Sequence, residues 1–177
     1  YMQVLPRFVS TDADGSDARE FLRDYFGNDI GKMNSMVFLK GYQWPFAAGH
    51  VPGSSLIDIF TYIETEQRHR RVFLDYRTDP EGLDFSKLNA ETKEYLERSG
   101  ILCDTPLKRL EILNSPAIEL YRRNGIDLAT EMLEIAVCAQ HNNGGIAVDL
   151  WWQTTIPGLF ACGECAGTHG IARPGGS

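Results

Sequence analysis

The sequence GLFACGECAGTHGIARPGGS, residues 158–177, ends the chain and holds its most informative residues. It contains Cys162-Gly-Glu-Cys165, and upstream of it stands Cys138-Ala-Gln-His141. Two such pairs of ligand-type residues, separated by a gap, are the pattern of a tetrahedral zinc site. The pattern allows three interpretations: a zinc site, a redox dithiol, or cysteines that only pack inside the protein.

The residues around the cysteines favour packing. Cys138 follows Glu-Ile-Ala-Val and Cys162 follows Gly-Leu-Phe-Ala, so both are predicted on apolar strands, where cysteine behaves as a small buried hydrophobe. A redox pair is expected at a helix N-terminus, and the acidic Glu164 between the sulfurs disfavours a thiolate. We predict buried bystander cysteines; the alternative is a zinc-stapled binding module that uses Cys138, His141, Cys162 and Cys165.

The composition is that of an ordinary soluble globular protein. The 177 residues are 43% hydrophobic and 23% charged, and the net charge is −7. This acidic balance argues against nucleic acid or an anionic membrane as the main partner. The basic run at residues 68–71 is interpreted as a solvated turn. No apolar run reaches the ~20 residues of a membrane span, and there is no signal-peptide pattern. A cytoplasmic location is the default expectation, and membrane association through a partner stays open.

The hydrophobic pattern predicts an α+β fold of mixed helices and short strands. Helices are predicted at residues 17–26, 89–100 and 115–125, the last with Ser115 as its cap and Pro116 at its first position. Strands are predicted at residues 36–42, 71–76 and 131–139, a hairpin at 146–156 and a short apolar strand at 157–164. Residues 56–67 fit either a helix or a strand.

Three motifs follow one another near the end of the chain: Gly-Gly-Ile at 144–146, Pro-Gly-Leu-Phe-Ala-Cys-Gly-Glu at 157–164, and His-Gly-Ile-Ala-Arg-Pro-Gly-Gly at 169–176. In this order they resemble the C-terminal part of the flavin-binding domain of the fumarate reductase / succinate dehydrogenase / L-aspartate oxidase flavoprotein family. The resemblance implies that residues 1–136 form a capping (substrate-lid) domain. Residues 137–177 would then be a truncated, C-terminal segment of an α/β FAD-binding domain.

The resemblance implies FAD as the cofactor and assigns five residues to it. An apolar strand that ends on Gly163 and Glu164 would present both to a nucleotide. Gly163 would let the cofactor approach the backbone, and Glu164 would accept hydrogen bonds from ribityl or ribose hydroxyl groups. Gly175, Gly176 and Ser177 would aim backbone N–H groups at the N1–O2 edge of the flavin.

The candidate catalytic residues are Arg173, His169 and His141. In the family, the arginine of the His-Gly-x-x-Arg motif binds a substrate carboxylate, which suits a planar, bidentate and permanently charged group. His169 is expected to shape the same turn. His141 is displaced by one residue from a family histidine, whose place is taken by Gln140. The implied activity is hydride transfer between FAD and a small, carboxylate-bearing organic acid of the fumarate or succinate type. The electron-transfer partner is left open.

Two departures from the family pattern argue against fumarate or succinate itself. Where the family has Gln-x-His-Pro, residues 3–6 read Gln-Val-Leu-Pro, so a leucine replaces a substrate-binding histidine. Where the family has Pro-Arg-Asp, whose arginine donates a proton, residues 52–55 read Pro-Gly-Ser-Ser. Arg7, Arg68 and Arg70 are the candidates to replace that arginine.

The dinucleotide fingerprint Gly-x-Gly-x-x-Gly is absent from the sequence. The chain also starts without an initiator Met and stops at a Gly-Gly-Ser that resembles the start of a helix. We therefore expect an excised piece of a longer flavoprotein, which by itself is inactive and binds FAD weakly or not at all.

Overall fold

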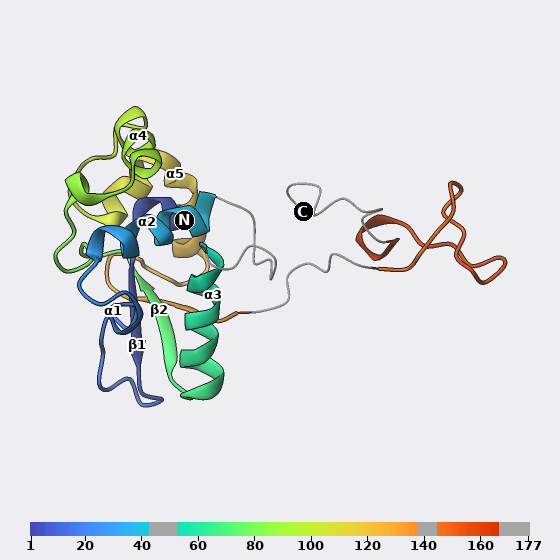
Figure 1. The fold of residues 1–177 in the computed structure, drawn as a ribbon, viewed down its shortest axis with the longest axis horizontal. Helices are drawn as coiled ribbons and strands as arrows, with labels where there is room; N and C mark the ends of the chain where they lie inside the picture. The colour runs from blue at the N-terminus through green and yellow to red at the C-terminus, as the bar shows by residue number, and fades with distance from the viewer. Residues whose placement is uncertain (43–52, 138–144, 167–177) are drawn as a thin grey trace. The chain divides into compact units, whose positions relative to one another are not determined.

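The computed structural model describes residues 1–42, 53–137 and 145–166 (Figure 1). The chain divides into two compact units, Tyr1–Val137 and Cys138–Ser177. The first unit combines helices with a small antiparallel sheet, which agrees with the predicted α+β class. In the described ranges, no helix has the length and apolar character needed to cross a membrane.

The sheet of the first unit has three strands in the order β1-β2-β3, and both pairs are antiparallel. The strands are β1 (Arg7–Thr11), β2 (Arg71–Asp75) and β3 (Leu133–Ile135). Val9 pairs with Phe73 across the first pair, and Phe73 pairs with Glu134 across the second. The predicted strand at 71–76 is confirmed as the central strand, and β3 lies within the strand predicted at 131–139.

The helices lie beside this sheet and at one end of it (Figure 1). They are α1 (Arg23–Phe26), α2 (Ile30–Tyr42), α3 (Ser55–Tyr62) with a π-helical continuation η3 (Ile63–Gln67), α4 (Ala90–Arg98) and α5 (Pro106–Arg123), with short 3-10 turns η1 (Met2–Val4), η4 (Phe85–Lys87) and η5 (Gly163–Ala166). The helix predicted at 89–100 is confirmed: the Asn89 side chain caps α4 by accepting a hydrogen bond from the Thr92 N–H at 2.8 Å. The ambiguous segment 56–67 is helical.

The strand predicted at residues 36–42 is wrong, because this segment is the second half of α2. Met33 and Val37 of α2 belong to one buried cluster, whereas Phe38 and Leu39 belong to a second one. A helix that is buried on two faces has a nearly continuous apolar run, which periodicity alone does not separate from a buried strand. The predicted helix at 17–26 is also shortened to α1, because Arg19 instead forms a β-bridge with Ser10.

Helix α5 has a kink that shifts the predicted start of its second half. Asn114 has a non-helical backbone (φ −160°, ψ 73°), and its side chain accepts a hydrogen bond from the Ala117 N–H at 3.2 Å. Asn114 is therefore the cap of the second half, where Ser115 was predicted. The first half begins after Thr105, whose hydroxyl accepts from the Lys108 N–H at 3.3 Å, and had no counterpart in the prediction.

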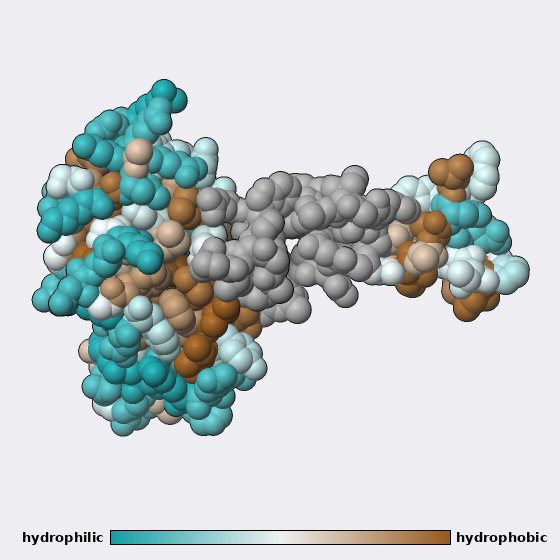
Figure 2. Space-filling model, viewed as in Figure 1, coloured by the Kyte–Doolittle hydropathy of each residue, from teal (hydrophilic) through white to brown (hydrophobic). Residues whose placement is uncertain are grey.

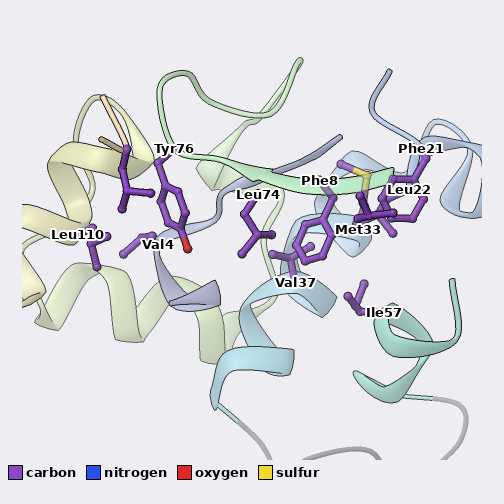
Figure 3. Packing of buried hydrophobic residues seen from close by; sticks show 12 residues of the cluster. Val4, Phe8, Phe21, Leu22, Met33, Val37, Ile57, Leu74, Tyr76 and Leu110 are labelled. Carbon is purple, nitrogen blue, oxygen red and sulfur yellow. The ribbon is translucent and has the colours of Figure 1, made fainter. Parts of the chain in front are cut away.

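The main core lies between the sheet and α2 (Figure 3). Phe8 of β1 and Leu74 of β2 point toward Met33 and Val37 of α2 in this view. Helix α3 adds the buried Ile57 to the same cluster. Because side chains from sheet and helices fill one cluster, burial of apolar surface holds the elements of the first unit together.

The second unit contains a hairpin over the residues where one was predicted. Val148 and Thr154 form an antiparallel bridge. The Asp149 carboxylate closes the turn between them by accepting hydrogen bonds from the N–H groups of Trp151 at 2.8 Å and Gln153 at 3.0 Å. The apolar strand predicted at 157–164 is reduced to one isolated bridge, between Gln153 and Phe160.

Candidate functional site

The candidate site in the second unit is the turn η5, Gly163–Ala166. Gly163 enters it with φ +71°, a left-handed conformation that favours glycine. The carbonyl oxygen of Cys165 accepts a hydrogen bond from the Ile146 N–H at 2.9 Å. Two of the three sequence motifs therefore meet here, since Ile146 ends the Gly-Gly-Ile motif and Gly163 belongs to the Pro-Gly-Leu-Phe motif.

The space next to the Cα atom of Gly163 is open. A Cβ atom placed on this glycine would meet no described atom within 4 Å. The residue thus combines a backbone conformation suited to glycine with an open approach to its Cα atom. Gly158 of the same unit has the same two properties, so the role of Gly163 rests on its place in the sequence motif.

The other predicted site residues are not described by the structure. Those outside the described ranges are His141, His169, Arg173, Gly175, Gly176 and Ser177. The backbone of Glu164 lies in η5, but its side chain is not described. Of the predicted cofactor-binding residues, Gly163 is therefore the one whose surroundings the structure gives in full, and the assigned roles stay predictions.

The prediction that the cysteines are buried is wrong for Cys162 and Cys165, which are both exposed. The reason is that the β-bridge pairing stops at Phe160, after which Gly163 turns the chain. Cys138 and His141, the other two ligands of the zinc alternative, lie outside the described ranges. Among the residues that are described, no group of three or more His, Cys, Asp or Glu side chains could hold a metal ion, so the zinc-stapled module is not favoured.

Large apolar side chains are exposed in the second unit, as the brown surface of its hairpin shows (Figure 2). Leu150 is 94% exposed, Trp151 80% and Phe160 60%. Polar surface separates these apolar side chains in the same view (Figure 2). Residues 157–160 are thus exposed on the surface of their unit, whereas Ala161 is buried.

In the first unit, carboxylates hold all three arginines named as replacement proton donors. Arg7 donates to Glu20 at 2.7 Å and also contacts the buried Asp75 at 3.4 Å. Arg68 donates to Glu64 at 2.6 Å. Arg70 forms an ion pair with Asp12, donates to the Asp17 carbonyl oxygen at 2.7 Å, and is only 10% exposed in its side chain. The interpretation of residues 68–71 as a solvated turn is therefore wrong for Arg70.

Glu64 is the centre of a charged cluster that the sequence did not predict. Its side chain is fully buried in the π-helical segment η3, with Arg70 at 3.6 Å and Arg19 at 3.9 Å in addition to Arg68. The Tyr25 hydroxyl donates to it at 3.4 Å, and burial raises the pKa of this tyrosine. The sequence signal that could have indicated this cluster is Glu64 itself, an acidic residue inside the apolar run 56–67 that is followed by the basic run 68–71.

Of the two departures from the family pattern, Leu5 and the described residues Ser54 and Ser55 are buried in the first unit. Leu5 has φ +54° and is fully buried in the cluster that contains Phe38 and Leu96. Ser54, at the start of α3, is 6% exposed. Position 5 therefore contributes to packing, and the side chain there is directed into the protein core.

The nearest ion pair along α3 from Ser54 joins this helix to α2. Lys40 Nζ lies 2.9 Å from Asp58 Oδ2, and each side chain is 17% exposed. Burial raises the pKa of the Asp58 carboxyl, and the hydrogen bond and charge of Lys40 oppose this only in part.

Comparison with known proteins decides the family. The family model described as an FAD binding domain matches residues 19–177, which is most of the chain. The chain belongs to this family. Its relatives include the L-aspartate oxidase of Streptomyces coelicolor, 46% identical over 54 residues, which are 29% of this chain and 9% of the relative. A fumarate reductase (CoM/CoB) polypeptide of Methanothermobacter marburgensis is 43% identical over 54 residues, 30% of this chain and 10% of that protein.

A longer match, 36% identity over 84 residues, relates the chain to an FAD-dependent oxidoreductase of Methanocaldococcus jannaschii and covers 47% of this chain and 15% of that protein. No solved structure matches the chain. The matched parts of these FAD-binding relatives are 9 to 15% of their length. The predicted membership in the fumarate reductase / succinate dehydrogenase / L-aspartate oxidase flavoproteins is confirmed, and FAD is the cofactor of the family.

Proposed function

We propose that this chain forms part of an FAD-dependent oxidoreductase that acts on a small organic acid with at least one carboxylate. The match of the FAD-binding family over residues 19–177 carries this proposal. The names of the relatives support the substrate class, because L-aspartate and fumarate are both small acids. When bound, FAD supplies a flavin ring that accepts or donates a hydride.

In the proposed reaction, residues of this chain bind the cofactor and the substrate and orient the substrate. Gly163 admits the cofactor to the backbone of η5, and Glu164 accepts hydrogen bonds from its hydroxyl groups. Arg173 binds the substrate carboxylate through two parallel N–H···O bonds, which fixes the substrate's orientation as well as its position. His169 shapes the turn that carries Arg173. His141, the third candidate catalytic residue, precedes the Gly-Gly-Ile motif at 144–146.

The first unit, with residues 1–136 as a capping domain, excludes water from the substrate when it closes. Its residues favour a substrate other than fumarate or succinate. Leu5 cannot donate a hydrogen bond to a substrate, and it is buried in the core. Arg7, Arg68 and Arg70 are each engaged with carboxylates, so none of these three is presented for proton donation to an alkene.

The test uses the flavoprotein that contains this chain, with Arg173→Ala, Arg173→Lys and the control Arg98→Ala, since Arg98 is 79% exposed in α4. Flavin reduction and oxidation are followed by rapid-mixing absorbance with a panel of mono- and dicarboxylic acids. We expect Arg173→Ala to lower kcat/KM by about 100-fold, equivalent to about 2.7 kcal/mol. Its flavin content should stay normal, and Arg173→Lys should recover part of the loss.

The control Arg98→Ala should behave like the unmodified protein. Unchanged kcat/KM in Arg173→Ala for every acid that is turned over would remove Arg173 from the substrate site. A flavoprotein that reacts with uncharged substrates as fast as with acids would contradict the proposed substrate class.

A further inference from the structure

Two exposed thiols lie on the same turn of the second unit. Cys162 immediately precedes η5 and Cys165 lies within it, and both cysteines are exposed. The Sγ atom of Cys165 donates a hydrogen bond to the carbonyl oxygen of Cys162 at 3.0 Å. The second sulfur is therefore held against the backbone of the first cysteine.

The geometry of this turn suits a covalent bond between the two sulfurs. Cys162 and Cys165 lie three residues apart across the turn that Gly163 opens, and the 3.0 Å contact from Cys165 Sγ to the Cys162 carbonyl oxygen brings the second sulfur to the backbone of the first cysteine. Disulfides bridge Cα atoms that are roughly 4.4 to 6.8 Å apart. The proposal requires the Cys162 side chain to rotate so that its sulfur reaches Cys165.

We propose that Cys162 and Cys165 form a reversible intramolecular disulfide, which makes η5 a site of thiol oxidation. The sequence argument against a redox pair was the expected lack of a helix N-terminus and the acidic Glu164 between the sulfurs. In the structure Cys162 directly precedes η5, and both sulfurs are exposed to an oxidant.

The oxidant in this proposal is a low-molecular-weight disulfide such as oxidised glutathione. One cysteine sulfur, having lost its proton, attacks a sulfur of the oxidant, forms a mixed disulfide and releases one thiol. The second cysteine sulfur then attacks the protein sulfur of the mixed disulfide, forms the Cys162–Cys165 bond and releases the second thiol. In total two S–H bonds are lost from the protein, one S–S bond is formed, and the oxidant is reduced to two thiols.

The disulfide encloses Gly163 and Glu164. Oxidation therefore restricts the backbone that, under the proposed function, contacts FAD, and this consequence alone rests on that function. Formation of the bond is a separate property of the chain. It can be measured without flavin, so failure of the disulfide and failure of the FAD assignment give different results.

The test uses the 177-residue chain with Cys103→Ser and Cys138→Ser, which retains the Cys162–Cys165 pair. The protein is equilibrated with graded ratios of reduced to oxidised glutathione and analysed by intact mass and peptide mapping. We expect the mass to fall by two hydrogen atoms, with no glutathione attached, and dithiothreitol to reverse the change. Addition of Cys162→Ser or Cys165→Ser should stop the reaction at a single glutathione adduct.

The contribution of the fold is measured by repeating the equilibration in concentrated urea. We expect the equilibrium constant for disulfide formation, taken from the glutathione ratio at half-oxidation, to be at least about tenfold larger in the folded chain than in urea. Two glutathione adducts on the pair, or persistence of both free thiols while the single-cysteine variants are modified, would overturn the proposal. Equal ratios with and without urea would show that the turn does not favour the bond.

Discussion

The substitution Arg109→Met tests how the first unit is held together. Arg109 on α5 is a fully buried arginine whose Nε donates to the Val4 carbonyl oxygen at 2.9 Å. Its other nitrogens donate to the carbonyl oxygens of Cys103 at 2.8 Å and Asp104 at 3.0 Å, and to the Asp79 carboxylate. One guanidinium therefore joins α5 to the segment just before Leu5, over a sequence separation of 105 residues.

The expected loss follows from these four partners. Methionine retains most of the apolar volume, so the cost comes from the oxygens that lose a charged donor. A hydrogen bond to a charged group contributes roughly 1.5 to 3 kcal/mol. The Val4 bond is buried and counts in full, the two part-buried carbonyl bonds count in part, and the 35% exposed Asp79 regains water. We expect the free energy of unfolding to fall by about 3 kcal/mol.

The assay is urea unfolding followed by far-UV circular dichroism, which reports on the first unit because the described α-helices lie there. With a slope of about 2 kcal/mol per molar urea, the midpoint should fall by about 1.5 M. The control Arg98→Met removes an exposed arginine paired with Glu94 and should change stability by less than about 0.5 kcal/mol. Equal midpoints for Arg109→Met and Arg98→Met would refute this account of the buried guanidinium.

Two further substitutions test the packing and the charges of the same unit. Gly31→Ala should lower the unfolding free energy by about 1 to 3 kcal/mol, because the new Cβ atom would lie 2.3 Å from the Lys87 carbonyl oxygen; a gain of about 1 kcal/mol, the helix-propensity value, would contradict this packing. Burial raises the pKa of the Asp75 carboxyl. The hydrogen bonds and charge of Arg77 lower this pKa by more than burial raises it, so the net shift is downward. Since the folded-state pKa lies below the unfolded one of about 4, Asp75 stabilises the fold above that pH, and this stability is lost as the pH falls through the folded pKa. Asp75→Asn should therefore reduce stability at pH 7 and flatten its acid dependence in a urea series at several pH values, whereas an unchanged slope would show that Asp75 does not contribute.

Local signals in the sequence predicted part of this fold. The strand β2 follows from its apolar centre between charged ends, and α4 follows from the helical pattern that stops at Gly100. The strand predicted in place of α2 failed because Met33 and Phe38 face different clusters, a fact that depends on which elements pack against the helix. A helix is recognised in a sequence when polar residues recur on one exposed face, and α2 has few such polar positions.

The site was predicted to a different degree. The order of the glycine motifs was sufficient to indicate the FAD-binding family, because it is a linear property. The exposure of Cys162 depends on where the bridge at Phe160 ends, and the pairing of Glu64 with Arg19 depends on residues far apart in the sequence. Such contacts are set by the tertiary fold, so spacing along the chain does not contain them.

The most direct test of the central claim is the flavin content of the flavoprotein proposed to contain this chain, measured for Gly163→Ala and Gly158→Ala. Both glycines have positive φ, +71° and +83°, and neither would place a Cβ atom within 4 Å of a described atom. The two substitutions therefore impose similar backbone strain in the same unit. Equilibrium titration with FAD should show affinity lowered by at least about tenfold, or about 1.4 kcal/mol, for Gly163→Ala and little changed for Gly158→Ala. Equal FAD affinities for the two variants would contradict the placement of FAD at η5.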